Sequence, residues 1–280
     1  MISMRYEGNN NIIDLINTPN LIITGYDGLD QPTSETITFS NPNKRGTQYQ
    51  RSSIQDRLIS LSFVVYDVEN TRYQLMNVFK SGEKGTLYLK NEYREGKIEC
   101  IFEEMTFEKF SNPTTCTIFL RATYPYFKGL EVIVKELSNV INMFVLEAYI
   151  PEEGIVLGEI SNEGTSEFIN ESDTELGVTI EISMLGIVTN PVIYNTTTNK
   201  FIGVNRLFAS GEKLVIKTSI GEKKIYVEKD GVQTNLINRL MKGSSFFQLV
   251  RGINKIKSDA TENGNNMVVY VDYQNEYEAI

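Results

Sequence analysis

The stretch "CTIFLRATYPYFKG" (residues 116–129) lies almost midway along the chain and combines the two features that organise it. In its first half, Cys116, Ile118 and Leu120 alternate with other residues, which is the period of two expected of a β-strand with one buried face. Its second half is a dense aromatic cluster followed by a glycine. The stretch therefore predicts a strand that ends where one part of the chain meets the next.

The aromatic cluster consists of Tyr124, Pro125, Tyr126 and Phe127. Proline fixes its own φ and biases the preceding residue toward extended backbone, so the chain leaves the strand stiffly. Two interpretations are compatible: the aromatic rings cap the first core, or they form a junction between domains. We predict a junction, with one domain over 1–130 and a second over 131–280.

Strand-like alternation recurs along the chain, at 58–65, 86–90, 97–105, 177–184 and 266–273. A hairpin is predicted around Ile220-Gly221, and "KDG" (229–231) predicts a further turn.

Helix signals are few. The best lies over 70–82, with Asn70 or Thr71 as a cap and Gly82 as a stop. Its predicted apolar stripe is Arg72, Leu75, Met76 and Phe79. Residues 234–243 predict one or two helical turns, and 134–144 fit either a helix or a strand. The chain is therefore predicted to be mainly β, with one firm helix.

Composition excludes several functions. The chain has no His, so Ser–His and Cys–His nucleophile schemes are excluded. Its formal net charge of −9 disfavours general affinity for nucleic acid or anionic membranes. No apolar run is long enough to span a bilayer and no signal peptide is evident, so we predict folding in a cytoplasm. Cys100 and Cys116 are interpreted as small core residues, with a cross-strand disulfide as the alternative.

Candidate chemistry is sparse. Glu103 and Glu104 are strand neighbours that point to opposite faces, and Glu152-Glu153 follow a proline in a turn-like stretch. Residues 258–266 lack the spacing of a calcium loop, and no Gly-rich phosphate loop is present. We predict no enzymatic activity, no cofactor and no metal.

One basic segment stands out in the first half. Residues 41–57 carry Lys44, Arg45, Arg51 and Arg57. These cations could contact nucleic acid, or they could belong to an exposed β-arm that pairs with a neighbouring acidic subunit. On an acidic chain we favour the candidate inter-subunit arm.

The order of these features resembles the distal tail proteins of long-tailed bacteriophages. In the first half the resemblance lies in "ITGYDGLDQP", "DRLISLSFVVYD", "RYQLMNVF", "GTLYL" and "FLRATYPYF". In the second it lies in "NPVIYNTTTNKFIGVN", "GEKLVIKTSIGEKKIYV", "SSFFQLVRGINKIK" and "VVYVDYQNEY". It implies an N-terminal tail-tube-like β-barrel or sandwich domain with one helix and a C-terminal galectin-like β-sandwich.

The resemblance also implies a function. Six copies would form a homohexameric hub ring in the virion, at the distal end of a phage tail assembled in the bacterial cytoplasm. The ring would join the tail tube protein to the tail tip, tail-associated lysin or baseplate proteins, with a receptor-binding protein as a further partner. DNA would pass through the ring without specific binding, and no membrane insertion is implied.

The sequence departs from the galectins at the residues that bind sugar. Galectins bind sugar with His and Trp among other residues, and this chain has neither. The galectin-like label is therefore an expectation about fold alone. Tyr194, Phe246, Phe247 and Tyr270 could offer aromatic faces, but their strand-like surroundings favour core or interface roles. A carbohydrate-binding module for host cell-wall glycans remains the alternative function.

Overall fold

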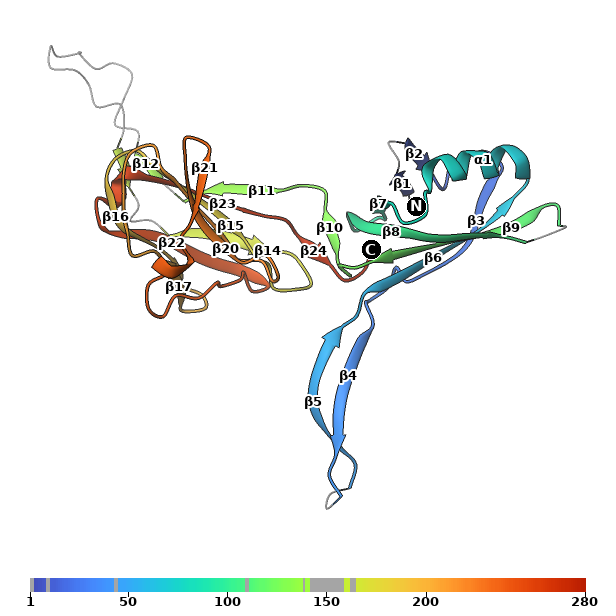
Figure 1. The fold of residues 1–280 in the computed structure, drawn as a ribbon, viewed down its shortest axis with the longest axis horizontal. Coiled ribbons are helices and arrows are strands. Elements are labelled where there is room, and N and C mark those ends of the chain that lie inside the picture. Colours follow the sequence, from blue (N-terminus) through green and yellow to red (C-terminus); the bar gives the residue numbers. More distant parts are fainter. Residues whose placement is uncertain are drawn as a thin grey trace, which may run out of the picture. The chain divides into compact units, whose positions relative to one another are not determined.

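The computed structural model describes residues 3–8, 11–42, 45–108, 111–137, 139–141, 159–161 and 165–280. The chain divides into two compact units (Figure 1). The first comprises Met1–Leu130 together with Glu276–Ile280, and the second comprises Glu131–Asn275. The sequence did not anticipate that Glu276–Ile280, placed in the second predicted domain, belong to the first unit.

The first unit is built on one large antiparallel sheet whose main path runs β2-β1-β7-β8-β9-β6-β3. Two short strands, β10 and β24, pair with each other, and β10 also pairs with β8. The strands of this sheet are β1 (Ser3–Gly8), β2 (Asn11–Asp14), β3 (Leu21–Asp27), β6 (Arg57–Val65), β7 (Lys84–Lys90), β8 (Glu95–Phe107), β9 (Thr114–Ala122), β10 (Phe127–Gly129) and β24 (Glu276–Tyr277).

The alternation seen in the sequence sets the buried face of this sheet. In β6 every second residue from Arg57 to Val65 is buried, and β9 repeats the pattern from Thr114 to Ala122. Residues directly opposite on these two antiparallel strands share a face, so Phe63 and Cys116 meet in the core. Cys100 and Cys116 are both buried free thiols, as the first of the two interpretations expected.

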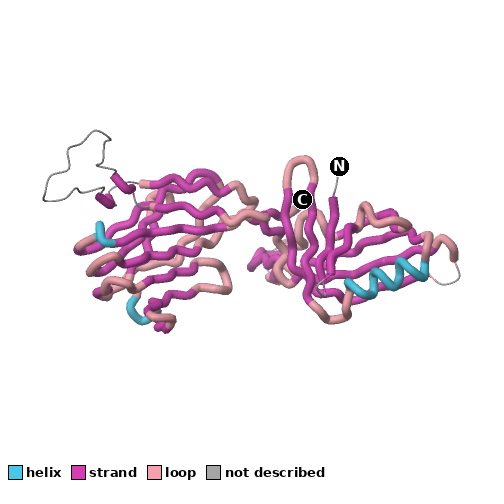
Figure 2. The backbone as a smooth tube through the Cα atoms, turned by 90° about the horizontal axis from the view of Figure 1, so that it is seen from above, coloured by secondary structure: helices cyan, strands magenta, loops and turns pink. Residues whose placement is uncertain are grey.

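Helix α1 (Val68–Val78) lies along the main sheet (Figures 1 and 2). It begins earlier than predicted because the Asp67 side chain, rather than Asn70 or Thr71, caps it by accepting from the Asn70 backbone N–H at 3.4 Å. It also ends earlier, because Phe79 is already extended and Gly82 lies beyond it.

The buried stripe of α1 also differs from the prediction. Thr71, Leu75 and Val78 face the core, whereas Met76 is 46% exposed. Arg72 is exposed and lies over the Phe107 ring, with 5.5 Å between its Cζ atom and the ring centroid. The predicted stripe was therefore correct at Leu75 and Phe79 and wrong at Arg72 and Met76.

A separate two-stranded hairpin is inserted between β3 and β6. It consists of β4 (Ser34–Ser40) and β5 (Thr47–Ile54), which pair only with each other among the described strands. Figure 1 shows this hairpin extending away from the main sheet of its unit. We call residues 34–54 the arm.

The second unit is a β-sandwich of two sheets. Its larger sheet runs β11-β23-β15-β19-β20-β21, and its smaller sheet runs β14-β22-β16-β17, with β18 paired to β16. The strands are β11 (Ile133–Glu136), β14 (Ser166–Asn170), β15 (Thr179–Met184), β16 (Val188–Asn195), β17 (Lys200–Gly203), β18 (Leu207–Phe208), β19 (Lys213–Lys217), β20 (Lys224–Lys229), β21 (Val232–Asn235), β22 (Gly252–Glu262) and β23 (Met267–Tyr273).

The core of this unit joins both sheets. Ile180 and Val269 from the larger sheet pack in one cluster with Phe168 and Ile193 from the smaller. The predicted alternation in 177–184 is confirmed, since Val178, Ile180 and Ile182 are buried.

The predicted turns of the second unit form where expected. Gly221, between β19 and β20, has a positive φ of 84°. Asp230 and Gly231 join β20 to β21 with positive φ at both positions, as a tight hairpin turn requires. Residues 237–239 form one 3-10 turn (Ile237–Arg239), and a second occurs at Gly264–Asn266. The ambiguous segment 134–144 contains β11 and β12 (Asn139–Ile141), which pairs with β13 (Glu159–Ser161), and 142–158 lie outside the described residues.

Candidate functional site

The arm is the most exposed regular structure of the first unit. Its burial pattern is almost entirely exposed on both strands. It nevertheless carries large apolar side chains, with Phe39 47% exposed, Tyr49 66% and Ile54 44%. A two-stranded ribbon has two unpaired edges and is marginal by itself in water. The exposed edges and aromatic side chains make the arm the candidate docking element of the first unit.

The register of the arm distributes its aromatics over both faces. Tyr49 lies opposite Thr38, and Phe39 lies opposite Gln48. Because paired residues share a face and successive residues alternate, Tyr49 and Phe39 point to opposite sides. The register shifts between Ile37 and Thr38, which marks a bulge or irregularity in the ribbon. Each face of the arm therefore presents one exposed aromatic side chain.

The predicted arm residues divide into two groups. Arg45, after β4, and Arg51, in β5, are both exposed. Lys44 lies outside the described residues. The prediction was wrong for Arg57. This residue lies in β6 at the root of the arm, and its side chain binds groups of its own unit.

Arg57 is 4% exposed and donates to four backbone carbonyls. Burial lowers the pKa of its guanidinium, against the field of nearby Asp30 and Glu278. Its Cζ atom lies 4.9 Å from the centroid of the Phe127 ring. The carbonyls and the ring face satisfy a cation that would otherwise be costly to bury. The sequence held a signal for this, because Arg57 continues the alternation of Ile59 and Leu61 on the buried face.

Two members of the aromatic cluster, Pro125 and Phe127, contact this arginine. Phe127 is fully buried in the core of the first unit, and the Pro125 carbonyl accepts from Arg57 Nε at 2.8 Å. Tyr124 and Tyr126 pack edge to face with 5.5 Å between ring centroids. The cluster thus caps the first core, one of the two compatible interpretations, and its role as a junction stays a prediction.

The cluster also holds the segment Glu276–Ile280. The Tyr124 hydroxyl donates to Glu276 Oε2 at 2.7 Å, and β24 pairs with β10. Burial raises the pKa of the Glu276 carboxyl, against the hydrogen bond from Tyr124 and the charge of Lys128. A segment far away in the sequence is therefore anchored next to the arm root.

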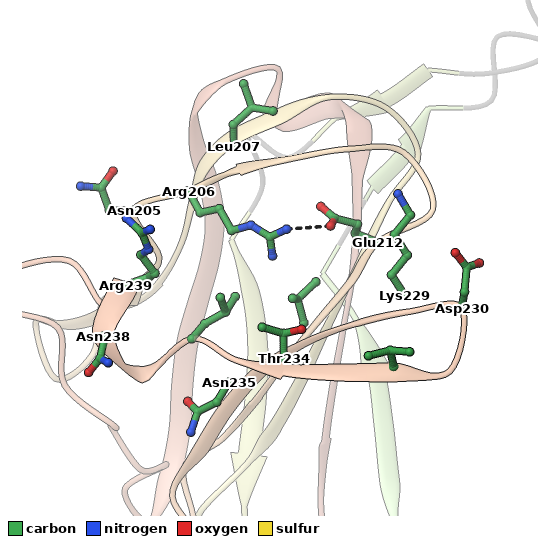
Figure 3. A pocket seen from close by; sticks show the side chains of 13 residues that line it. Asn205, Arg206, Leu207, Glu212, Lys229, Asp230, Thr234, Asn235, Asn238 and Arg239 are labelled. Carbon is green, nitrogen blue, oxygen red and sulfur yellow. Dashed lines mark hydrogen bonds and ion pairs between the residues drawn. The ribbon is translucent and has the colours of Figure 1, made fainter.

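The second unit contains a cleft of about 950 Å³ between the β20–β21 hairpin and the loop before β18 (Figure 3). At its floor Arg206 Nη2 donates to Glu212 Oε1 at 2.7 Å, and Glu212 is 7% exposed. Glu212 Oε2 accepts from the Ala209 N–H at 2.9 Å, and the Arg206 Cζ atom lies 4.8 Å from the Phe208 ring centroid. The Arg206–Glu212 ion pair thus holds the loop on both sides of β18, which lines the cleft.

None of the residues lining this cleft is aromatic, so the cleft offers no ring on which a sugar could stack. The predicted aromatic candidates lie elsewhere. Phe247 is 1% exposed in the core and Phe246 packs against it, whereas Tyr194 and Tyr270 are 37% and 38% exposed.

Of the carboxylates considered from the sequence, Glu103 is held by an arginine. Arg121 binds Glu103 and also donates to Asp56 Oδ2 at 2.6 Å. Glu152 and Glu153 lie outside the described residues. Within the described residues no three His, Cys, Asp or Glu side chains are grouped as a metal site would need. No helix in that part of the chain is long and apolar enough to cross a membrane.

Two family models match the chain. Residues 10–121 match the phage tail protein RIFT-related domain, and residues 171–277 match the siphovirus-type tail component, C-terminal domain. No curated protein sequence matches.

Solved structures share the fold along the whole chain. The crystal structure of the SPP1 Dit protein, described as a paradigm of hub adsorption apparatus in Gram-positive infecting phages, has a TM-score of 0.66 at 12% identity, covering 99% of each chain. Chains of the phage P2 baseplate in its activated conformation, with Ca or with Sr, have TM-scores of 0.52 and 0.50 at 11% and 10% identity, covering 100% of each chain.

Proposed function

This chain belongs to the distal tail proteins of siphophages, structural components of the tail, and we propose that six copies close into a hub ring. In this proposal the ring lies at the distal end of the tail, in a virion assembled in the bacterial cytoplasm. It joins the tail tube protein to tip or baseplate proteins and leaves a channel for DNA. Its role is mechanical, without catalysis.

The arm is the observation that carries the proposal. It presents Phe39 and Tyr49 to solvent on opposite faces, and exposed strand edges that a second chain would cover. In a closed ring every subunit uses the same pair of surfaces, so one arm per copy supplies one contact per neighbour. The exposed cations Arg45 and Arg51 fit a neighbour that carries an excess of acidic groups, as this chain does.

The negative charge of the chain is consistent with a channel through which DNA passes without being bound. Each copy has a formal net charge of −9. A basic lining would bind phosphates and slow the passage of DNA, whereas an acidic ring has no net attraction for it. The partners proposed at the two faces of the ring are the tail tube protein and the tip, lysin or baseplate proteins, with a receptor-binding protein beyond them.

The carbohydrate-binding alternative has less support. The cleft of the second unit has no aromatic lining, and the partly exposed Tyr194 and Tyr270 lie outside it. Saturable binding of a glycan from a cell-wall panel to the purified chain would support the carbohydrate-binding function.

The test of the ring is the absolute mass in solution, measured by light scattering over a range of protein concentrations. A hexamer of the 31.8 kDa chain has a mass six times larger, about 191 kDa. We expect that mass, or its appearance when the tail tube protein is added. A mass of one chain at every concentration, with and without the tube protein, would overturn the proposal.

A further inference from the structure

One buried side chain, that of Arg57, joins the root of the arm to the rest of its unit. Arg57 Nη1 donates to the Gly28 carbonyl at 2.8 Å and to the Asp30 carbonyl at 2.5 Å. Its Nε donates to the Pro125 carbonyl at 2.8 Å, and its Nη2 donates to the Glu278 carbonyl at 2.7 Å. One guanidinium therefore joins three segments that are far apart in the sequence.

The geometry of these bonds is specific to arginine. A guanidinium offers five N–H donors in a rigid planar fork, whereas a lysine ammonium is a flexible point charge. Four carbonyls around one buried fork fix the relative positions of the segments that carry them. Removal of the fork would take the donor from four carbonyls, of which the Pro125 carbonyl lies in a buried hydrogen bond.

Two of the four carbonyls belong to the strand connection through which the chain enters the arm. The chain leaves β3 at Asp27, turns at Gly28 with a φ of 78°, and reaches β4 at Ser34. A Cβ atom at Gly28 would lie 2.0 Å from the Leu58 carbonyl oxygen, so this turn is pressed against β6. The arm pairs with no other described strand, and its direction is therefore set at this root.

The Glu278 carbonyl belongs to the segment that returns to the first unit at Glu276. This segment has anchors that do not involve Arg57. Arg94 Nη1 donates to the Ala279 carbonyl at 3.2 Å, and the Arg94 Cζ atom lies 4.7 Å from the Tyr277 ring centroid. The segment is thus held from two sides, and Arg57 links one of them to the arm root.

We propose that Arg57 is a positioning residue, and that it fixes the direction of the arm only while segment Glu276–Ile280 is docked beside it. This role rests on the proposed function, because a fixed direction of the arm matters only if the arm contacts a neighbouring copy. Since this segment carries the chain back from the second unit, docking it would make the arm ready for assembly only after both units have formed.

The test is a distance measurement between two spin labels. Labels at Gln50→Cys on the arm and Tyr73→Cys on α1 report the direction of the arm relative to the sheet that α1 covers. Both positions are exposed, whereas the native thiols Cys100 and Cys116 are buried and escape labelling. Labelled chain is diluted into an excess of unlabelled chain, so that each assembly contains one pair.

We expect one narrow distance peak in the parent chain. In Arg57→Lys and Arg57→Gln the narrow peak should be lost, while far-UV circular dichroism is unchanged. In Tyr277→Ala, which loosens the segment and leaves Arg57 in place, the peak should also be lost. Arg94→Gln is the matched control, since Arg94 binds the same segment through Ala279 and Tyr277, and in this variant the peak should persist.

A narrow peak in both folded Arg57 variants would overturn the positioning role, and a narrow peak in Tyr277→Ala would overturn its dependence on the segment. Unfolding of both Arg57 variants would also overturn it, because Arg57 would then support the whole core. The distances do not depend on ring formation. A chain that stays a single copy but loses its peak in the Arg57 variants would refute the ring and leave the positioning role standing.

Discussion

Tyr49→Ser should weaken assembly of the ring without weakening the fold. Tyr49 is 66% exposed in the isolated chain. An aromatic side chain buries roughly 150–250 Å², so about 100–150 Å² remains for a neighbour to cover. At about 25 cal/mol per Å² this corresponds to ~3 kcal/mol. Ordering the side chain costs about 1 kcal/mol, which leaves ~2 kcal/mol per contact.

A loss of that size weakens each contact about 10- to 30-fold. Light scattering should therefore show the midpoint of assembly moving to protein concentrations at least about tenfold higher. The free energy of unfolding, from urea titration of the dilute chain, should change by less than about 0.5 kcal/mol, because the side chain touches little of its own unit.

Two further variants sharpen the result. Tyr93→Ser removes a tyrosine that is 91% exposed in the turn between β7 and β8, and it should leave assembly unchanged. Phe39→Ser changes the opposite face of the arm, so a difference between it and Tyr49→Ser identifies the face that is covered. Unchanged assembly in both arm variants would refute the reasoning from exposed aromatics.

Three other predictions concern single groups. Cys100 and Cys116 are buried, and burial raises the pKa of each thiol to about 12, so neither should react with a thiol reagent at pH ~8 until the chain is unfolded. Glu212→Gln should lower the free energy of unfolding of the second unit by about 2 kcal/mol, because it weakens the buried pair with Arg206. Burial, then a nearby carboxylate, raises the pKa of Asp272, so Asp272→Asn should stabilise the fold at neutral pH.

The sign of the Asp272 effect follows from proton linkage. A raised pKa means that the folded state binds the proton more tightly than the unfolded state does. The stability that this gives is complete below the unfolded pKa of about 4 and is lost as pH rises through the folded pKa. Urea titrations should show the gain from Asp272→Asn at pH ~7 and little gain at pH ~3.5. A gain of the same size at both pH values would contradict the assignment.

Each of the other two predictions also has a contrary outcome. Reaction of either native thiol as fast as in denaturant would show that the core around it opens. For Glu212→Gln the matched control is Glu167→Gln, whose partner Lys255 lies 3.7 Å away with both side chains 56% exposed. That variant should cost less than about 0.5 kcal/mol, and an equal cost in both would show that burial of the pair is unimportant.

The strands could be predicted because their signal is local. A period of two shows which residues of β6, β9 and β15 face a core, and the structure buries those residues. The tight turn at Asp230-Gly231 is also local, since few residues adopt positive φ twice in succession. The helix was predicted less well, because several polar residues before it could act as a cap and only the fold selects Asp67.

The features around the arm could not be predicted in the same way. A basic stretch in the sequence does not distinguish Arg51, which faces solvent, from Arg57, which is buried six residues later. The return of Glu276–Ile280 to the first unit depends on partners more than 140 residues earlier in the chain, such as Tyr124. Such pairing leaves no periodic trace in either segment.

Arg57 is a charged residue at a buried position in the apolar alternation of β6. A charged residue at the buried end of a strand alternation requires enough hydrogen-bond acceptors to offset its desolvation. In the first unit those acceptors are backbone carbonyls supplied by the arm root, the aromatic cluster and the returning segment. A position that breaks the apolar alternation is therefore a place where distant segments are expected to meet, and here they meet at the base of the element proposed to contact a neighbour.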